Sequence, residues 1–331
     1  MVGQMTKASL ATQRQLLIAL SNAEFQSGQR LADALGVSRT AIANHVKQLQ
    51  LLGLDIYQVK GRGYRLAEPL QLLDAAKINQ LRLNGSPEVV VHNITDSTNS
   101  QLMQRVTDGV IDTLGYTLVA EAQTAGRGRR GRNWYSPFGA SLYFSMYWRL
   151  EQGIQSAMGL SLVVALAVVR LLKQQYQLDA KVKWPNDVYV DGKKLAGILV
   201  ELAGQAHAGC NVIIGIGLNI RLPKQAVENI DQQYTDLNTV TVQHIDRNSL
   251  VAQLQQQLVA ILTDFSHSGF DNYVEEFNAY NQYQQRVVKL SGNEEIEGIC
   301  LGVDKQGALL IKTDMGVKNY YGGELSLRLG G

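Results

Sequence analysis

Cysteine is almost absent from this chain of 331 residues, which has only Cys210 and Cys300. The two lie far apart in the sequence and match neither a disulfide framework nor a zinc knuckle. We therefore expect two buried, unreactive thiols and a protein of the reducing cytoplasm. An excess of charge of either sign is also absent, because 31 Lys and Arg stand against 29 Asp and Glu. The whole molecule is thus no general polyanion binder, and any binding of nucleic acid must be local.

Signals for export, membrane insertion and metal binding are missing as well. Polar residues are scattered through the N-terminus, and no apolar run there ends in a small-residue cleavage site, so we expect no signal peptide. A charge-free stretch lies between Glu151 and Arg170, but its continuously apolar part, LVVALAVV, is too short to cross ~30 Å of hydrocarbon. We predict a buried helix over residues 156–173 and no membrane partner. No metal-ligand spacing is found among the five histidines, His45, His92, His207, His244 and His267.

Hydrophobic patterning divides the chain into three parts, in an α+β multidomain arrangement. Residues 1–68 have apolar positions at helical spacing over 10–22, then two further helical segments that begin after the N-cap residues Ser27 and Ser38. The segment DIYQVKGRGYRLA gives two alternating runs around a glycine-flanked basic turn, which predicts a hairpin. Three helices and such a hairpin make a winged helix-turn-helix.

The second part begins after Glu68-Pro69, where proline disfavours helix at the preceding residue and the hydrophobic pattern restarts. Over residues 69–284, strand-like runs surround the buried helix and a helical stretch follows at 247–282, which predicts a central mixed α/β domain. Residues 285–331 show short alternating runs separated by glycine-bearing turns. This pattern predicts a small β-barrel.

The most unusual string is GRGRRGR at residues 126–132. Its three glycines free the backbone to wrap a ligand, and its four arginines supply fixed positive charge, so an anionic ligand is indicated. A solvated basic linker is the alternative, but the string lies between two strand patterns within the central domain. The loop lacks the Lys-Ser/Thr pair of a Walker A motif, so a nucleotide bound here must be held in another way.

A second string, KWPND at residues 183–187, precedes a predicted hairpin that turns at Asp191-Gly192. Lys194 lies just past that turn, where its ammonium can stabilise charge moving from a carboxylate to a phosphate. A surface lysine on an edge strand is the plainer interpretation. Asp187 either helps hold Mg²⁺ against phosphate oxygens or merely caps a turn.

These strings occur together with DSTN at residues 96–99 and GIGLN at residues 215–219. In that combination the chain resembles, over nearly its whole length, the bifunctional biotin protein ligase and biotin operon repressor family. The resemblance implies a class II synthetase-like catalytic domain and an SH3-like C-terminal barrel. It also implies biotin, ATP and Mg²⁺ as ligands, with biotinyl-5'-AMP formed first and biotin then passed to a lysine of the biotin carboxyl carrier protein of acetyl-CoA carboxylase.

The resemblance further implies roles for individual residues. Catalysis would involve Lys194, Arg127 and Arg129, and Asp187 would be a magnesium ligand. The residues that would bind biotin and the adenylate are Ser97, Thr98, Asn99, Gln123, Arg127, Gly128, Arg129, Trp134, Lys194, Gly197, Gly215 and Asn219. A core aromatic is the alternative for Trp134, and residues 222–242 match no assigned part of the family pattern.

The third helix predicts a DNA-binding surface, since four polar residues lie opposite its apolar face and Arg62 stands on the wing. The four are Arg39, Thr40, Asn44 and Lys47. A lone winged helix offers few contacts, so we expect a homodimer, favoured by biotinyl-AMP, on operator DNA of biotin genes.

Three alternatives remain at this stage. A lipoate-type ligase shares the acyl-adenylate chemistry, although the arginine-rich loop and the winged helix favour biotin. A ligand-sensing repressor without catalysis would be expected to lack an intact loop or Lys194, and both are present. The third is a ligase whose winged helix has lost its operator and survives as a folding unit.

Overall fold

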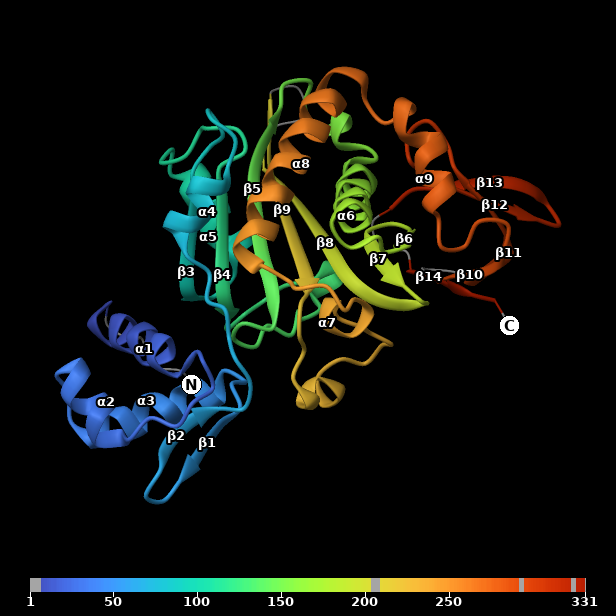
Figure 1. The fold of residues 1–331 in the computed structure, drawn as a ribbon. Helices are drawn as coiled ribbons and strands as arrows, with labels where there is room; N and C mark the ends of the chain where they lie inside the picture. Colours follow the sequence, from blue (N-terminus) through green and yellow to red (C-terminus); the bar gives the residue numbers. More distant parts are fainter. Residues whose placement is uncertain (1–6, 204–208, 292–294, 323–325, 331) are drawn as a thin grey trace.

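The computed structural model describes residues 7–203, 209–291, 295–322 and 326–330. Residues 1–6 lie outside the described residues, and they belong to the N-terminal segment in which we expected no signal peptide. Figure 1 shows a small helical unit at the N-terminus, a central sheet flanked by helices and a small β-structure at the C-terminus. This is the α+β arrangement predicted from the sequence.

The first unit is a winged helix-turn-helix, as predicted. Its elements are α1 (Lys7–Leu20), α2 (Gly28–Leu35), α3 (Arg39–Leu51), β1 (Ile56–Val59) and β2 (Gly63–Leu66). Ser27 and Ser38 cap α2 and α3 by accepting hydrogen bonds from backbone N–H groups of the first turn. Gly36 ends α2 in the left-handed conformation, with φ 64°.

The helical unit has its own apolar core but also packs on the central domain. Leu16, Leu20 and Ile42 are fully buried in this core. Phe138 of the central domain belongs to the same apolar cluster, and its backbone N–H donates to the carbonyl of Leu52 at 2.8 Å. The winged helix-turn-helix is therefore anchored through the segment that follows the glycine-arginine loop.

The central domain is built on a seven-stranded mixed sheet in the order β3-β4-β5-β9-β8-β7-β6. Strand β3 pairs parallel with β4, and the other neighbours are antiparallel. The strands are β3 (Val89–Thr95), β4 (Thr117–Gln123), β5 (Ser141–Leu150), β6 (Lys181–Lys183), β7 (Asp187–Val190), β8 (Lys193–Ala203) and β9 (Cys210–Asn219). Helices pack on both faces, and they are α4 (Ala75–Leu81), α5 (Thr98–Thr107), α6 (Leu160–Tyr176), α7 (Leu237–Val240) and α8 (Arg247–Ser268).

Alternation along β5 separates the two faces of the sheet. Phe144, Met146 and Trp148 point into the main core with α6 and α8, whereas Tyr147 joins a smaller cluster with Leu102 of α5. Figure 1 shows α6 and α8 side by side over the sheet. The α5 side carries less apolar cover, and the ligand cavity opens there.

Helix α6 is the buried helix predicted over residues 156–173, although it begins and ends later. With the 3₁₀ turn before it, the segment Ile154–Tyr176 is long and apolar enough to cross a membrane by length and composition alone. Its side chains decide the matter, because Leu162, Val164 and Leu166 are at most 2% exposed within the core. The helix therefore belongs to the core because its side chains are buried there. The reason we gave from the sequence, a short apolar run, does not distinguish it from a membrane span.

The single helical stretch predicted over residues 247–282 was wrong in its extent. Helix α8 ends at Ser268, because Gly269 adopts φ 67°, and a 3₁₀ turn leads into the separate helix α9 (Val274–Tyr280). The C-terminal strands follow as a five-stranded antiparallel sheet in the order β13-β12-β11-β10-β14. They are β10 (Val287–Ser291), β11 (Glu295–Val303), β12 (Leu309–Thr313), β13 (Gly316–Tyr320) and β14 (Ser326–Leu329).

The C-terminal β-structure is firmly joined to the central domain. Its apolar residues Val288, Cys300 and Ile311 belong to the same buried cluster as α6. Trp184 of the KWPND segment is 1% exposed and donates its indole N–H to the carbonyl of Gly307 at 3.1 Å. These contacts bring the last strand, β14, to the edge of the ligand cavity.

Candidate active site

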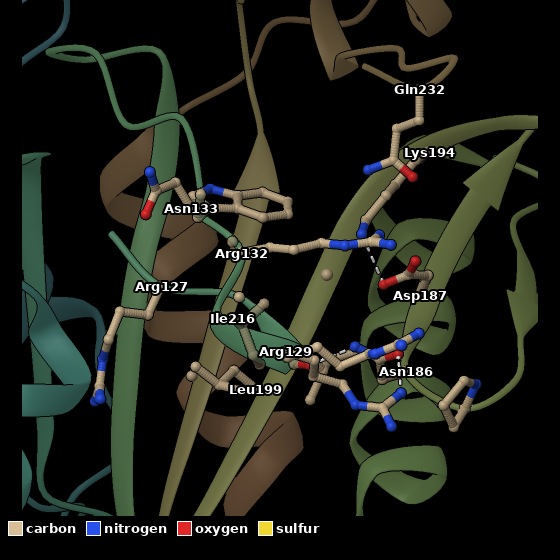
Figure 2. Close-up of a pocket in the computed structure, with 18 of the residues that line it drawn as sticks. Arg127, Arg129, Arg132, Asn133, Asn186, Asp187, Lys194, Leu199, Ile216 and Gln232 are labelled. Carbon is tan, nitrogen blue, oxygen red and sulfur yellow. Dashed lines mark hydrogen bonds and ion pairs between the residues drawn. The ribbon is translucent and has the colours of Figure 1, made fainter. Parts of the chain in front are cut away.

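A cavity of about 420 Å³ lies on the α5 side of the central sheet, and a second of about 350 Å³ adjoins it. The first is lined by the start of α5, the glycine-arginine loop, the KWPND segment and strands β8 and β9. Figure 2 shows the loop crossing in front of these strands, with side chains from both sides converging. Eleven of the twelve residues expected to bind the ligand line this cavity; they are Ser97, Thr98, Asn99, Gln123, Arg127, Gly128, Arg129, Trp134, Lys194, Gly197 and Gly215.

One end of the cavity is neutral and polar. Ser97 is the N-cap of α5, so the DSTN string is both a helix cap and a cavity wall. Gln123 accepts hydrogen bonds through Oε1 from the backbone N–H of Thr98 at 2.9 Å and from its hydroxyl at 3.2 Å. Ser97, Thr98 and Asn99 are at most 4% exposed. Fixed donors and acceptors of this kind suit an uncharged polar heterocycle.

The glycine-arginine loop bridges the cavity through two anchored arginines. Arg129 donates to Oδ1 of Asn186 at 2.9 Å, and Arg127 donates to a carboxylate oxygen of Glu201 at 2.8 Å. Figure 2 shows Arg127 directed away from Arg129. Burial lowers the pKa of the Arg129 guanidinium, with Asp187 opposing the effect. The loop thus carries its charges on both sides of the cavity rather than at one point.

The hairpin after KWPND brings two opposite charges into the cavity. Its turn falls at Asp191 and Gly192, both with positive φ, as predicted. Lys194 Nζ lies 2.8 Å from a carboxylate oxygen of Asp187, and the two side chains are 13% and 16% exposed. Lys194 is therefore a partly buried, paired ammonium inside the cavity and no surface lysine.

Trp134 lines both cavities. Its ring lies against Gly197 and Gly217, where a Cβ on either glycine would overlap it, and Lys194 Nζ is 5.3 Å from the ring centroid. Asn219 borders the second cavity and not the first, so its contact with the ligand stays a prediction.

Several basic residues that we had not assigned to the ligand also line the first cavity. They are Arg130, Arg132, Lys183 and Arg328. Burial lowers the pKa of the Lys183 ammonium, and the nearby cations Lys194, Arg328 and Arg132 act in the same direction against Asp187. Residues 231–232 of the segment that matched no assigned part of the pattern close the same wall. Lys183 belongs to the KWPND string, which pointed to the site, whereas no motif near Arg328 in the chain pointed to it.

No group of three or more His, Cys, Asp or Glu that could hold a metal occurs among the described residues. Asp187 faces the cavity, but Lys194 already pairs with it. An all-protein metal cage is thus excluded within the described ranges. One carboxylate beside a cationic cavity fits a magnesium ion that is held mainly by substrate phosphates.

The predicted DNA surface is exposed as its spacing requires. Ile42, Val46 and Leu49 of α3 are buried, whereas the four polar residues on the other face, Arg39, Thr40, Asn44 and Lys47, are exposed. Arg62 lies on the wing, and its guanidinium stacks 4.2 Å from the ring centroid of Phe25. Arg65 approaches the same ring at 5.1 Å.

Comparison with known proteins agrees with this geometry. The profile described as the biotin/lipoate A/B protein ligase family matches residues 93–219, an HTH domain profile matches 12–65, and the biotin protein ligase C-terminal domain matches 285–328. The chain is 43% identical to the bifunctional ligase/repressor BirA of Escherichia coli over 95% of its own length and 96% of that protein. The chain belongs to the bifunctional biotin ligase/repressor family.

Other relatives support the same membership. Bifunctional ligase/repressor BirA of Bacillus subtilis is 30% identical over 94% of this chain and 96% of that protein. Among solved structures, the biotin protein ligase from Aquifex aeolicus in complex with biotin and ATP superposes with a TM-score of 0.64 at 30% identity, covering 73% of this chain and 99% of that chain. The ligase/repressor family thus matches this chain along nearly all of its length, whereas the exact domain boundaries after residues 68 and 284 stay predictions.

Proposed function

We propose that this protein is an ATP-dependent biotin protein ligase that also represses transcription of biotin-synthesis genes. The observation that carries the proposal is the division of one cavity into a neutral polar end and a strongly cationic end. Biotin has an uncharged ureido ring at one end and a carboxylate at the other, and ATP brings a triphosphate. The cavity matches that distribution of charge.

At the neutral end, Ser97, Thr98, Asn99 and Gln123 would hold the ureido ring, while Gly197 and Gly215 leave room for the ligand beside the strands. Thr98 and Gln123 are already joined by two hydrogen bonds, so little reorganisation is needed when biotin arrives. Trp134 would stack near the adenine. The second cavity, which Trp134 and Asn219 both line, would give the nucleotide space.

At the cationic end, Lys194 would stabilise the negative charge that gathers where the biotin carboxylate attacks the α-phosphate of ATP. Its ion pair with Asp187 holds the ammonium in the cavity. Arg129 would bind phosphate oxygens after release from Asn186, and Arg127 and Gly128 would close over biotin. Pyrophosphate then leaves, and biotinyl-5'-AMP remains enclosed.

In the second step, a carrier lysine would attack the mixed anhydride, and AMP would leave. The protein's contribution is to orient the reactants and to exclude water through the loop, since no covalent enzyme intermediate is required. We infer that the acceptor is the biotin carboxyl carrier protein of acetyl-CoA carboxylase. We also infer that Mg²⁺ accompanies ATP with Asp187 as a protein ligand, where it would neutralise phosphate charge.

For repression, Arg39, Thr40, Asn44 and Lys47 would meet the major groove, and Arg62 would meet a backbone phosphate of the operator. Two half-sites require two copies, so we infer a homodimer that biotinyl-AMP favours, in the cytoplasm where the DNA lies. The coupling must be reciprocal, so operator DNA favours the same dimer. Sedimentation with and without biotin and ATP tests this, since an adenylate-loaded protein that stays monomeric while it occupies the operator would contradict it.

Exchange of labelled pyrophosphate into ATP tests the catalytic proposal directly. We expect exchange that depends on biotin and not on lipoate, followed by labelling of carrier protein when biotin is the substrate. Exchange supported equally by lipoate would favour a lipoate-type ligase. Biotin binding without any exchange would point to a ligand sensor that lacks catalysis.

A further inference from the structure

Glu201 is an acidic residue on β8 that joins two parts of the site. One of its carboxylate oxygens accepts a hydrogen bond from Asn99 Nδ2 at 2.8 Å and another from Arg127 at 2.8 Å. Asn99 belongs to the neutral end of the cavity, and Arg127 belongs to the glycine-arginine loop. The side chains of Glu201 and Arg127 are 26% and 44% exposed, so solvent screens this ion pair and the hydrogen bond to buried Asn99 is the better shielded of the two.

The hydrogen bonds of Asn99 within the protein leave its side-chain amide only as an acceptor toward a ligand. Its two N–H groups are both engaged, one with Glu201 at 2.8 Å and the other with the carbonyl of Leu199 at 3.3 Å. Its Oδ1 lies 2.5 Å from the hydroxyl of fully buried Ser145, which donates to it or to Thr98 Oγ1 at 2.7 Å. An amide oxygen has two lone pairs, so only the second lone pair of Oδ1 remains for a ligand.

An ionised carboxylate can only accept hydrogen bonds, so it must face the nitrogen of the amide and never the oxygen. Asn99 also lies against the backbone of Gly215, where a Cβ would overlap its amide. We propose that Glu201 is a positioning residue that fixes Asn99 as a hydrogen-bond acceptor for an N–H group of the ligand while it anchors Arg127 of the loop.

This inference rests on the proposed function, in which the ligand is biotin. The ureido ring of biotin carries two N–H donors and one carbonyl acceptor. An Asn99 amide with its oxygen presented therefore fits one N–H of that ring. A free amide could turn over and present donors instead, so Glu201 would add both affinity and selectivity against rings that lack the N–H.

Two single variants and their combination, which moves the negative charge from position 201 to position 99, test the idea. Glu201→Gln alone removes the charge at constant shape, and we expect biotin binding, measured by calorimetry without ATP, to weaken by about tenfold. Asn99→Asp places two carboxylates face to face and should weaken binding further. Combining Asn99→Asp with Glu201→Gln restores one donor facing one acceptor, so we expect the double variant to bind biotin at least about tenfold more tightly than Asn99→Asp alone.

Glu276→Gln is the matched control, because Glu276 is 28% exposed and also pairs with an arginine, Arg170, far from the cavity. It should leave biotin binding unchanged. In pyrophosphate exchange, Glu201→Gln should raise the KM for biotin much more than it lowers kcat, with the KM for ATP preserved. A purely structural role would instead lower the thermal midpoint and disturb both substrates together.

Two results would overturn the inference. One is wild-type biotin affinity in Glu201→Gln, and the other is a double variant that binds no better than Asn99→Asp. The wild-type protein separates this inference from the proposed function. Failure of its biotin-dependent exchange refutes the function, whereas normal wild-type exchange with either of those two variant results refutes only the role of Glu201.

Discussion

Removing one partner of the buried ion pair between Glu121 and Arg247 should destabilise the protein severely. Glu121 on β4 is 0% exposed and Arg247 at the start of α8 is 4% exposed, with 2.8 Å between Nη1 and the carboxylate oxygen. The pair also binds the linker between the winged helix-turn-helix and the central domain. Glu121 accepts a hydrogen bond from the N–H of Leu73, and Arg247 donates one to the carbonyl of Gln71. Arg247→Ala leaves a carboxylate buried without its counter-charge, which costs about 3–5 kcal/mol.

The exposed pair between Arg149 and Glu151 is the control for that magnitude. Its separation is 2.9 Å, almost the same, but the two side chains are 39% and 76% exposed. Arg149→Ala should therefore cost no more than about 1 kcal/mol. Replacing both Glu121 and Arg247 with methionine removes the unpaired charge and should recover much of the loss.

Urea unfolding followed by tryptophan fluorescence measures these differences in the free energy of unfolding. All three tryptophans lie in the central domain, where both pairs are found; they are Trp134, Trp148 and Trp184. Equal losses for Arg247→Ala and Arg149→Ala would refute the argument, since burial would then not determine the strength of an ion pair at fixed distance.

Three further predictions concern the site, the DNA surface and the thiols. Lys194→Ala should lower the rate of adenylate formation ~10²–10³-fold with a much smaller loss of biotin binding; equal losses would contradict its catalytic role. Lys47→Ala and Arg62→Ala should weaken operator binding, and loss of a phosphate contact should flatten the slope of log affinity against log salt by about 1, whereas unchanged binding would remove the DNA assignment. Burial raises the thiol pKa of Cys210 and Cys300, so a thiol reagent at neutral pH should modify them only after unfolding; rapid native modification would show that they are accessible.

The sequence predicted those parts of the site that are local in the chain. Three such parts are the loop at 126–132, the KWPND segment and the hairpin with Lys194. Each is recognisable from a few consecutive residues, because turn residues and glycines determine the backbone geometry locally. The winged helix-turn-helix was readable for the same reason. Its caps and its apolar spacing are short-range signals.

Long-range contacts could not be predicted in this way. Arg328 reaches the cavity only because the C-terminal strands dock against the central domain. The residues next to Arg328 in the sequence do not predict that docking. Glu201 looks like an ordinary polar residue of a strand, and its partners Asn99 and Arg127 lie 102 and 74 positions away. Alternation along β9 predicts that Asn219 faces the same side as Gly215 and Gly217, but it does not predict that Asn219 borders the second cavity rather than the first.

The wall of the ligand cavity is assembled from residues as far apart as Ser97 and Arg328. The full cavity can therefore form only after the chain has been synthesised through Arg328 and this residue has left the ribosome. Truncated products that lack β14 would keep the winged helix but lose Arg328 from the cavity wall. If occupancy governs repression as proposed, such fragments would be poor regulators, and control of the genes would depend on synthesis of the chain through β14.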